Sequence, residues 1–199
     1  MRFHGDDPEA ALDDIEARYR EQNAATRVSI YDLTEPADLT PRLRARGYRN
    51  DETTLTMAKL VQSRDAPAHV DVSEHPGDEW REVYLGSITE NRRLVNARIL
   101  ESIPRPCAWF ACRRDGRVIS TGLGVADGAF AVIECMATRA EVRRQGGADA
   151  VLRSLEAWAI ARGVKTLALQ AVADNSAAIP LYTRFGFAPV AINRFWQSD

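Results

Sequence analysis

The chain has 199 residues, of which 45% are hydrophobic and 27% charged, and its 26 basic and 28 acidic side chains give a formal net charge of −2. A chain of this size buries roughly 70% of its unfolded surface on folding, so its core needs no disulfide or metal. The near-neutral charge excludes a dedicated nucleic-acid binder or a protein that binds anionic membranes, because both carry a strong basic excess. No apolar run approaches the roughly 18 residues of a membrane span.

The three cysteines are an odd number and too few for a disulfide framework. The three histidines, His4, His69 and His75, show no spacing typical of metal ligands. The N-terminal sequence turns acidic at once and lacks the apolar core of a signal peptide. These observations predict a reduced, cytoplasmic protein with no metal site.

The first third of the chain is predicted as helix, strand, helix, strand. Leu12, Ile15 and Tyr19 recur at the spacing of one helix face, which predicts a helix over 9–22. The elements predicted next are a strand at 26–33, a short helix at 38–46 that ends before Gly47, and a strand at 53–60. A segment punctuated by prolines and glycine follows, and we predict a linker at 65–78.

The remainder of the chain is predicted as a longer α/β run. The dipeptides Asp115-Gly116 and Asp127-Gly128 separate apolar runs and predict a three-stranded antiparallel meander. The predicted elements are strand 70–72, helices 79–85 and 90–102, strands 107–113, 117–125 and 129–138, helix 147–162, strand 165–172, helix 176–185 and strand 188–197.

An internal repeat runs through the chain at a constant offset of 139 residues. Both copies have the order helix, strand, helix, glycine-aromatic pair, strand, which predicts a duplication. The matched pairs are Trp158 and Tyr19, Leu167 and Val28, Leu169 and Ile30, Gly186 and Gly47, and Phe187 and Tyr48.

The segment 136–152 has the composition of an anion site. It leaves a strand, passes through a basic turn with Gly146 and Gly147, and enters an amphipathic helix. The first N–H groups of a helix have no intrahelical acceptor, and the helix dipole favours an anion there. Arg143 and Arg144 add positive charge, so a phosphate or pyrophosphate would fit. P-loop and Rossmann fingerprints are absent from it. The alternative is an ordinary glycine-containing turn with solvated arginines.

The residues Arg143-x-x-Gly146-x-Ala148 resemble the [QR]-x-x-G-x-[GA] signature of the GNAT superfamily of acetyl-CoA-dependent N-acetyltransferases. The segments Met136–Val142, 155–164 and 173–187 are similar to other motifs of that family in order and spacing, and the resemblance covers about 70–199. It implies an α/β protein of the α+β type, the GNAT fold, with a central, mixed but mostly antiparallel sheet flanked by helices.

The repeat adds a degenerate N-terminal GNAT-like half to this fold. The predicted organisation is a degenerate segment at 1–64, a linker at 65–78 and a GNAT acetyltransferase domain at 70–199. The N-terminal counterpart of the basic turn is residues 4–9, His-Gly-Asp-Asp-Pro-Glu, which is acidic where phosphate binding requires positive charge. Leu43 stands opposite Tyr182. We therefore expect one active site per chain.

The resemblance implies that acetyl-CoA is the co-substrate and that no metal takes part. Its pyrophosphate would bind backbone N–H groups of Arg144 to Ala148, its pantetheine would pair with the end of the preceding strand like an added strand, and Asn175 would contact the pantetheine arm. The cofactor-binding residues predicted in this way are Met136, Ala137, Thr138, Arg143, Arg144, Gln145, Gly146, Gly147, Ala148, Asn175 and Tyr182.

Two residues are predicted to be catalytic. A lysine-like amine costs roughly 4–5 kcal/mol to deprotonate at pH 7, so a general base helps. Glu134 lies within an apolar strand, where a raised pKa is expected, and resembles the base of some family members. The alternative is that it faces solvent or an arginine. Tyr182 matches the family position of an acid that protonates the leaving thiolate; the alternative is a core tyrosine with a satisfied hydroxyl.

The sequence therefore predicts an N-acetyltransferase that moves an acetyl group from acetyl-CoA to a primary amine by direct attack through a tetrahedral intermediate. The acceptor is a small-molecule or peptide amine, with no nucleic-acid or membrane partner, and a homodimer stays open. One alternative is a non-catalytic acyl-CoA-binding or sensing module. Another is a structural or interaction protein whose glycine turn binds no cofactor.

Overall fold

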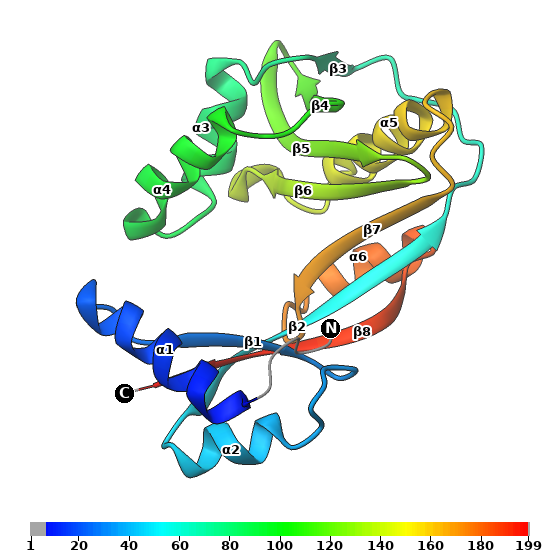
Figure 1. Ribbon diagram of the computed structural model, residues 1–199. Coiled ribbons are helices and arrows are strands. Elements are labelled where there is room, and N and C mark those ends of the chain that lie inside the picture. Colours follow the sequence, from blue (N-terminus) through cyan, green and yellow to red (C-terminus); the bar gives the residue numbers. More distant parts are fainter. Residues whose placement is uncertain (1–6, 199) are drawn as a thin grey trace. The chain divides into compact units, whose positions relative to one another are not determined.

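The computed structural model describes residues 7–198 (Figure 1), so the first three residues of the acidic segment 4–9, with His4 among them, lie outside the described chain. The chain forms two compact units. The first consists of the described residues of Met1–Met57, Gln170–Pro180 and Pro189–Asp199, and the second of Ala58–Leu169 and Leu181–Ala188. No helix of the described chain is long and apolar enough to cross a membrane.

The first unit contains two helices and a small sheet with the strand order β1-β8-β2-β7. Its elements are α1 (Pro8–Glu21), β1 (Arg27–Tyr31), α2 (Leu39–Ala45), most of β2 (Arg49–Leu60) and β8 (Ala188–Gln197), and the end of β7 (Thr166–Val172). The side chain of Asp7 accepts a hydrogen bond from Glu9 N at 2.9 Å and thereby caps α1. Leu12, Leu43 and Trp196 belong to the buried core beneath the helices.

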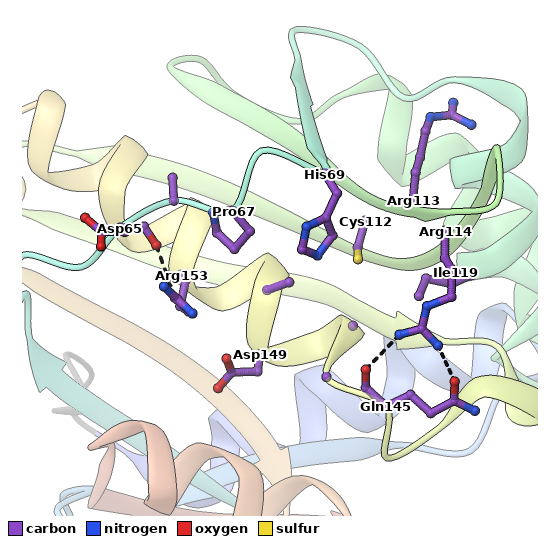
Figure 2. Close-up of a pocket in the computed structure, with 14 residues that line it drawn as sticks. Asp65, Pro67, His69, Cys112, Arg113, Arg114, Ile119, Gln145, Asp149 and Arg153 are labelled. Atoms are coloured by element: carbon purple, nitrogen blue, oxygen red, sulfur yellow. Dashed lines mark hydrogen bonds between the residues drawn. The ribbon is translucent and has the colours of Figure 1, made fainter.

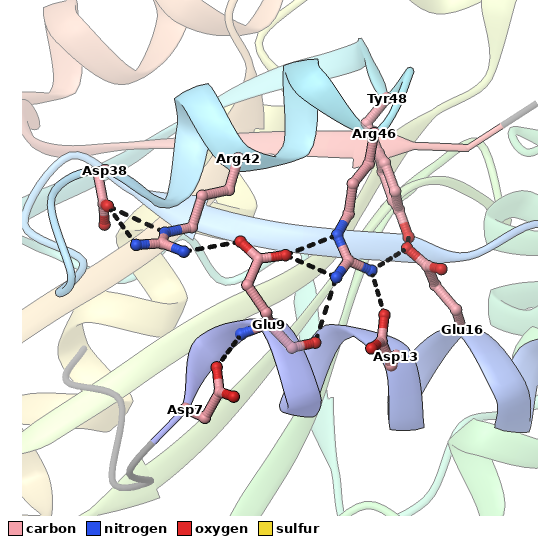
Figure 3. Close-up of polar contacts among 8 residues, drawn as sticks. All are labelled: Asp7, Glu9, Asp13, Glu16, Asp38, Arg42, Arg46 and Tyr48. Carbon is pink, nitrogen blue, oxygen red and sulfur yellow. Dashed lines mark hydrogen bonds and ion pairs between the residues drawn. The ribbon is translucent and has the colours of Figure 1, made fainter.

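An ion-pair network joins α1 to α2 (Figure 3). Glu9 lies at its centre, with Arg42 Nη1 2.7 Å from Oε1 and Arg46 Nη2 2.6 Å from Oε2. Arg46 also contacts Asp13 at 2.7 Å and Glu16 at 3.1 Å. The hydrogen bond from Arg42, and then that from Arg46, lowers the pKa of Glu9. Charge at the surface therefore reinforces the packing of the two helices.

The second unit contains the strand order β2-β7-β6-β5-β4-β3. Strands β3 to β6 pair antiparallel with their neighbours, whereas β6 and β7 pair parallel, as a mixed but mostly antiparallel sheet requires. Its further elements are β3 (Val70–Ser73), α3 (Asp78–Gly86), α4 (Glu90–Glu101), β4 (Cys107–Arg114), β5 (Arg117–Asp127), β6 (Phe130–Thr138), the 3₁₀ turn η1 (Ala140–Val142), α5 (Gly147–Ala161) and most of α6 (Ala178–Phe185).

Helices cover both faces of this second sheet. On one face Trp109 and Leu123 pack with Trp80 of α3 and Leu100 of α4. On the other face the sheet has small residues, and a Cβ at Gly124 would lie 3.0 Å from the Trp158 ring of α5. Alternation along β4 and β5 thus assigns α3 and α4 to one face and α5 to the other.

The two copies of the repeat end their second helices in the same way. Gly47 and Gly186 have φ of +83° and +104°, a conformation that glycine adopts without strain. Tyr48 N donates to Leu43 O and Phe187 N donates to Tyr182 O, each at 3.0 Å. The order helix, strand, helix, strand predicted for both copies is confirmed.

The predicted elements are all present, with differences at their ends. Strand β2 begins at Arg49, four residues before the predicted start, and α6 begins at Ala178 rather than 176. The turn η1 was not predicted. The compact units do not follow the predicted segments 1–64, 65–78 and 70–199, because β8 pairs with β1. Those segments stay a prediction about the origin of the chain.

Candidate active site

The turn between β6 and α5 presents unpaired backbone N–H groups. Gly146 is the N-cap of α5 with φ of +86°, and it offers no side chain to satisfy the helix. The first bond of the helix runs from Ala150 N to Gly146 O at 2.9 Å. The backbone N–H groups of residues 144–149 donate no hydrogen bond to any acceptor within residues 7–198. A helix start of this kind binds phosphate or carboxylate groups.

The backbone of this turn is open to a ligand. A Cβ built at Gly146 would meet nothing within 4 Å, whereas one at Gly147 would lie 3.1 Å from the Ser120 Cβ. Arg144 has φ of +60°, a left-handed conformation that is unusual for a residue with a side chain. The predicted segment Met136–Ala148 is continuous here: it ends β6, forms the turn and begins α5. The residues present therefore fit a pyrophosphate.

Strand β6 has a free edge next to this turn. Its parallel pairing with β7 covers four residues, from Phe130↔Thr166 to Ile133↔Leu169. Its antiparallel pairing with β5 continues on the other side as far as Thr138. In the described structure the β7-facing edge of residues 134–138 is therefore unpaired, and an extended ligand could add to it as a strand.

A bulge in β6 lies at the start of the free edge. Glu134 is opposite Leu123, but Ala137 is opposite Thr121, so two residues of β6 face one residue of β5. One of them, Cys135, has φ of +55°. Burial raises the pKa of its thiol to about 12, so it is protonated at neutral pH. This bulge is not among the features predicted from the sequence.

A glycine on β5 makes room for the bulge. A Cβ at Gly122 would lie 2.6 Å from Val151 Cγ1 and 2.8 Å from Met136 Sδ. Both distances are shorter than real contacts allow, so only glycine lets α5 and the bulged strand approach this closely. An isolated glycine within a strand pattern is the sequence signal that could have revealed the bulge.

Glu134 lies at the edge of the bulge with an exposed side chain. Within the described chain its carboxyl has no hydrogen-bond partner and no ion-pair partner. The atoms packed around the carboxyl withdraw water from it and raise its pKa, and no arginine opposes this effect. A carboxylate that is unpaired and more basic than usual can accept a proton.

Tyr182 of α6 is 7% exposed. Burial, and then the charge of Glu134, raises the pKa of its hydroxyl to about 12. Its ring packs edge-on against Phe187, with centroids 5.9 Å apart. No residue of the described chain hydrogen-bonds the hydroxyl. A core tyrosine normally satisfies this group, so Tyr182 is unlike an ordinary core tyrosine.

Asn175 belongs to the first compact unit, whereas the other predicted site residues belong to the second. Its Oδ1 accepts hydrogen bonds from Ala178 N at 3.0 Å and Ala177 N at 3.3 Å. The side-chain oxygen therefore caps the start of α6. The side-chain amide nitrogen of Asn175 makes no hydrogen bond within the described chain. A contact with the pantetheine arm stays a prediction.

A pocket of about 450 Å³ opens beside the first turn of α5 (Figure 2). Arg114 Nη2 donates to Gln145 O at 2.9 Å, and its other nitrogen contacts the Gln145 amide oxygen. Arg153 Nε donates to Asp65 O at 3.1 Å. The sequence did not predict that the linker and β4 would contribute walls here. Besides α5, the lining comes from Asp65–Pro67, His69, Cys112–Arg114, Ile119 and Gln145.

No group of three or more His, Cys, Asp or Glu side chains within residues 7–198 could hold a metal ion. The polar groups of the site are instead unpaired N–H donors at the turn, a carboxylate at the bulge and a phenol on α6. This set can hold an anion, accept one proton and donate another.

Residues 71–187 match the family model described as "Acetyltransferase (GNAT) family". A curated relative, "Uncharacterized N-acetyltransferase YobR" of Bacillus subtilis (strain 168), is 28% identical over 127 residues, which are 61% of this chain and 50% of that protein. The chain therefore matches about half the length of this relative.

Solved structures of the same fold cover nearly the whole chain. A GCN5-related N-acetyltransferase from Kribbella flavida aligns with 100% of this chain and 77% of its own, at a TM-score of 0.70 and 16% identity. A tandem GNAT protein from the clavulanic acid biosynthesis pathway aligns with 96% of this chain and 69% of its own, at 0.73 and 13% identity. Such identities establish the fold and nothing further.

Proposed function

Because the chain belongs to the GNAT family of acetyltransferases, acyl-transferring enzymes that include N-acetyltransferases, we propose that it transfers an acetyl group from acetyl-CoA to a primary amine. The observation that supports this most is the set of unpaired N–H groups at 144–149, next to a free strand edge at 134–138. The unpaired N–H groups can bind a pyrophosphate, and the free strand edge can pair with the amide groups of the pantetheine chain.

The residues that would hold acetyl-CoA follow from this arrangement. Backbone N–H groups of Arg144 to Ala148 bind the pyrophosphate, with Arg143 and Arg144 supplying charge. Met136 to Thr138 bind the pantetheine through backbone groups on the free edge. When bound, acetyl-CoA supplies an acetyl thioester. The bulge at Cys135 then lies between the cofactor edge and Glu134.

The proposed mechanism uses Glu134 and Tyr182 in turn. Glu134 accepts a proton from the substrate ammonium, and the neutral nitrogen attacks the thioester carbonyl carbon through a tetrahedral intermediate. The C–N bond forms and the C–S bond breaks. Tyr182 donates its hydroxyl proton to the departing thiolate sulfur and regains one from the amide nitrogen, while Glu134 releases its proton to water. The raised pKa of Glu134 makes it a stronger base, and the raised pKa of Tyr182 keeps its hydroxyl protonated until the thiolate departs.

Titration calorimetry with acetyl-CoA, with ATP as a control nucleotide, tests the binding step. We expect micromolar binding at one site per chain, weakened in Arg143→Ala and unchanged in Arg98→Ala, an exposed arginine on α4. No binding at millimolar acetyl-CoA would exclude the pyrophosphate site.

Acetylation of a panel of primary amines tests the transfer step. We expect Tyr182→Phe to keep cofactor binding and lose most turnover, whereas Tyr19→Phe retains both. Binding without any transfer in the unmodified protein would instead identify a non-catalytic acyl-CoA sensor.

A further inference from the structure

The exposed face of β6 carries two large apolar side chains in line with Glu134. Phe130 and Val132 are 59% and 42% exposed, whereas Ala131 and Ile133 between them are 1% and 2% exposed. Because side chains alternate along a strand, Phe130, Val132 and Glu134 share one face. We call Phe130 and Val132 the apolar strip.

The neighbours of the strip leave space above it. Thr166 and Ala168 of β7 lie directly opposite Phe130 and Val132 in the parallel register, and both are small. On the β5 side, Asp127 is opposite Phe130. The strip is therefore a shallow apolar surface with a carboxylate at each end.

The two carboxylates differ in their surroundings. Glu134 is next to the bulge and the free edge, where the acetyl group would lie, and it has no partner in the described chain. Asp127 ends β5 at the turn, where water is plentiful. Glu134 follows Phe130 by four positions of extended strand, a length of about 13 Å.

From this juxtaposition we propose that the acceptor is an arylalkylamine, whose ammonium pairs with Glu134 while its aromatic body lies on the apolar strip. This inference rests on the function proposed above and names its substrate class. The unpaired carboxylate of Glu134 favours binding of a cation, and the exposed apolar strip beside it favours a cation with an apolar group attached.

Other occupants fit the strip less well. A polyamine that paired its ends with Glu134 and Asp127 would place a middle ammonium group over the apolar Val132 side chain, which offers no carboxylate. Two apolar side chains are too little surface for a protein partner, since a stable interface buries about 800 Å² on each side. A short polar amine would leave the strip exposed.

Equilibrium binding tests the inference independently of catalysis. Calorimetry in the presence of CoA would compare 2-phenylethylamine with ethylamine, spermidine and the neutral isostere 2-phenylethanol. We expect 2-phenylethylamine to bind on the order of ten-fold more tightly than each of the others, because only it uses both the charge and the strip. Equal affinity for ethylamine, or tighter binding of spermidine, would overturn the proposal.

Variants separate the two contributions. Val132→Ser should weaken 2-phenylethylamine binding by about five- to ten-fold and leave ethylamine unchanged, because Val132 is the apolar residue nearer to Glu134. Val72→Ser is the matched control, because Val72 is also an exposed valine, on β3, three strands away in the sheet. Glu134→Gln should abolish the preference for the amine over the alcohol. Equal effects on all ligands, or effects from Val72→Ser, would contradict the assignment.

The outcomes also distinguish a failure of the arylalkylamine inference from a failure of the proposed acetyltransferase function. If spermidine is acetylated and 2-phenylethylamine is not, the acetyltransferase function holds and the arylalkylamine class is wrong. If acetyl-CoA does not bind, the proposed function fails, and the binding preference still decides whether the strip recognises arylalkylamines.

Discussion

Lys59 and Glu156 form an ion pair in the interior of the second unit, with Nζ 2.6 Å from Oε1 and side chains 3% and 0% exposed. Gln62 N donates to the same oxygen at 2.8 Å, and Arg64 Nε lies 3.4 Å from Oε2. The Lys59 ammonium also lies 4.6 Å from the centroid of the Phe185 ring. The pair thus links β2, α5 and the end of α6.

Removing one member of this pair should destabilise the protein strongly. Glu156→Leu leaves a buried ammonium without its partner, and we expect a loss of about 3–5 kcal/mol in the free energy of unfolding. The double variant Lys59→Met/Glu156→Leu removes both charges and should recover much of that loss. Urea unfolding of the unmodified protein, the single variant and the double variant measures both the loss and its recovery. A double variant no more stable than the single one would show that the pair is not the cause.

The activity of the enzyme should depend on the ionisation of Glu134. Because the atoms packed around this carboxyl withdraw water and raise its pKa, the acid limb of the kcat/KM profile should lie above the ordinary glutamate value of 4.5. Activity falls as the pH drops through this limb, since the base becomes protonated. Glu134→Gln should remove the limb and lower the rate by about 10²-fold or more. A limb that persists in Glu134→Gln would assign it to another group.

Tyr182 should act as an acid throughout the usual assay range. Its pKa of about 12 keeps the hydroxyl protonated, so Tyr182 itself adds no alkaline limb near neutral pH. The unfolded chain ionises its tyrosines near pH 10, so the unfolding free energy should decline as the pH rises from about 10 to 12. Tyr182→Phe should lack this part of the decline. Unfolding measured across that range, with Tyr19→Phe as the control, checks the sign.

The left-handed backbone at Arg144 should make glycine favourable there. With φ of +60°, Arg144→Gly relieves strain and is expected to raise the unfolding free energy by about 0.5–1 kcal/mol. Arg144→Ala keeps the Cβ and should give no such gain. Both variants lose the same charge, so acetyl-CoA affinity should fall equally in the two. Unequal affinities would mean that the strain itself shapes the binding turn.

The network around Glu9 should stabilise the first unit only above acidic pH. Hydrogen bonds from Arg42 and Arg46 lower the pKa of Glu9, so its contribution is present above the ordinary value of 4.5 and is lost as the pH falls through the lower folded value. Glu9→Gln should therefore melt at a lower temperature than the unmodified protein at pH 7, and the difference should shrink as the pH falls below 4.5. Glu21→Gln, at the other end of α1, is the control.

Sequence patterns predicted the helices and strands because each is determined by residues close together in the chain. Periodic apolar residues indicated α1, and the Asp-Gly turns indicated the meander of β4 to β6. Gly146 and the two arginines indicated the turn before α5. These features depend on neighbours within a few residues, which the sequence shows directly.

The features that the sequence did not predict depend on distant contacts. The bulge at Cys135 exists because β6 pairs with β5 while Gly122 admits Met136 from the side. The pocket beside α5 needs the linker residue Asp65 to reach Arg153, 88 residues away. The oxygen of Asn175 caps α6, a use that its position before a helix could have indicated, and its contact with a ligand stays a prediction.

The pairing of β1 with β8 has a consequence for truncation of the chain. The segment similar to the family ends in β8, but β8 hydrogen-bonds to β1 from Arg27↔Gln197 to Tyr31↔Asn193. A fragment cut at the linker would lose β1 and β2, the two strands that flank β8, so β8 would have no partner strand and Trp196 would lose the core that buries it. Such a fragment should aggregate, because β7 and β8 would both expose backbone N–H and C=O groups that β1 and β2 pair in the full chain.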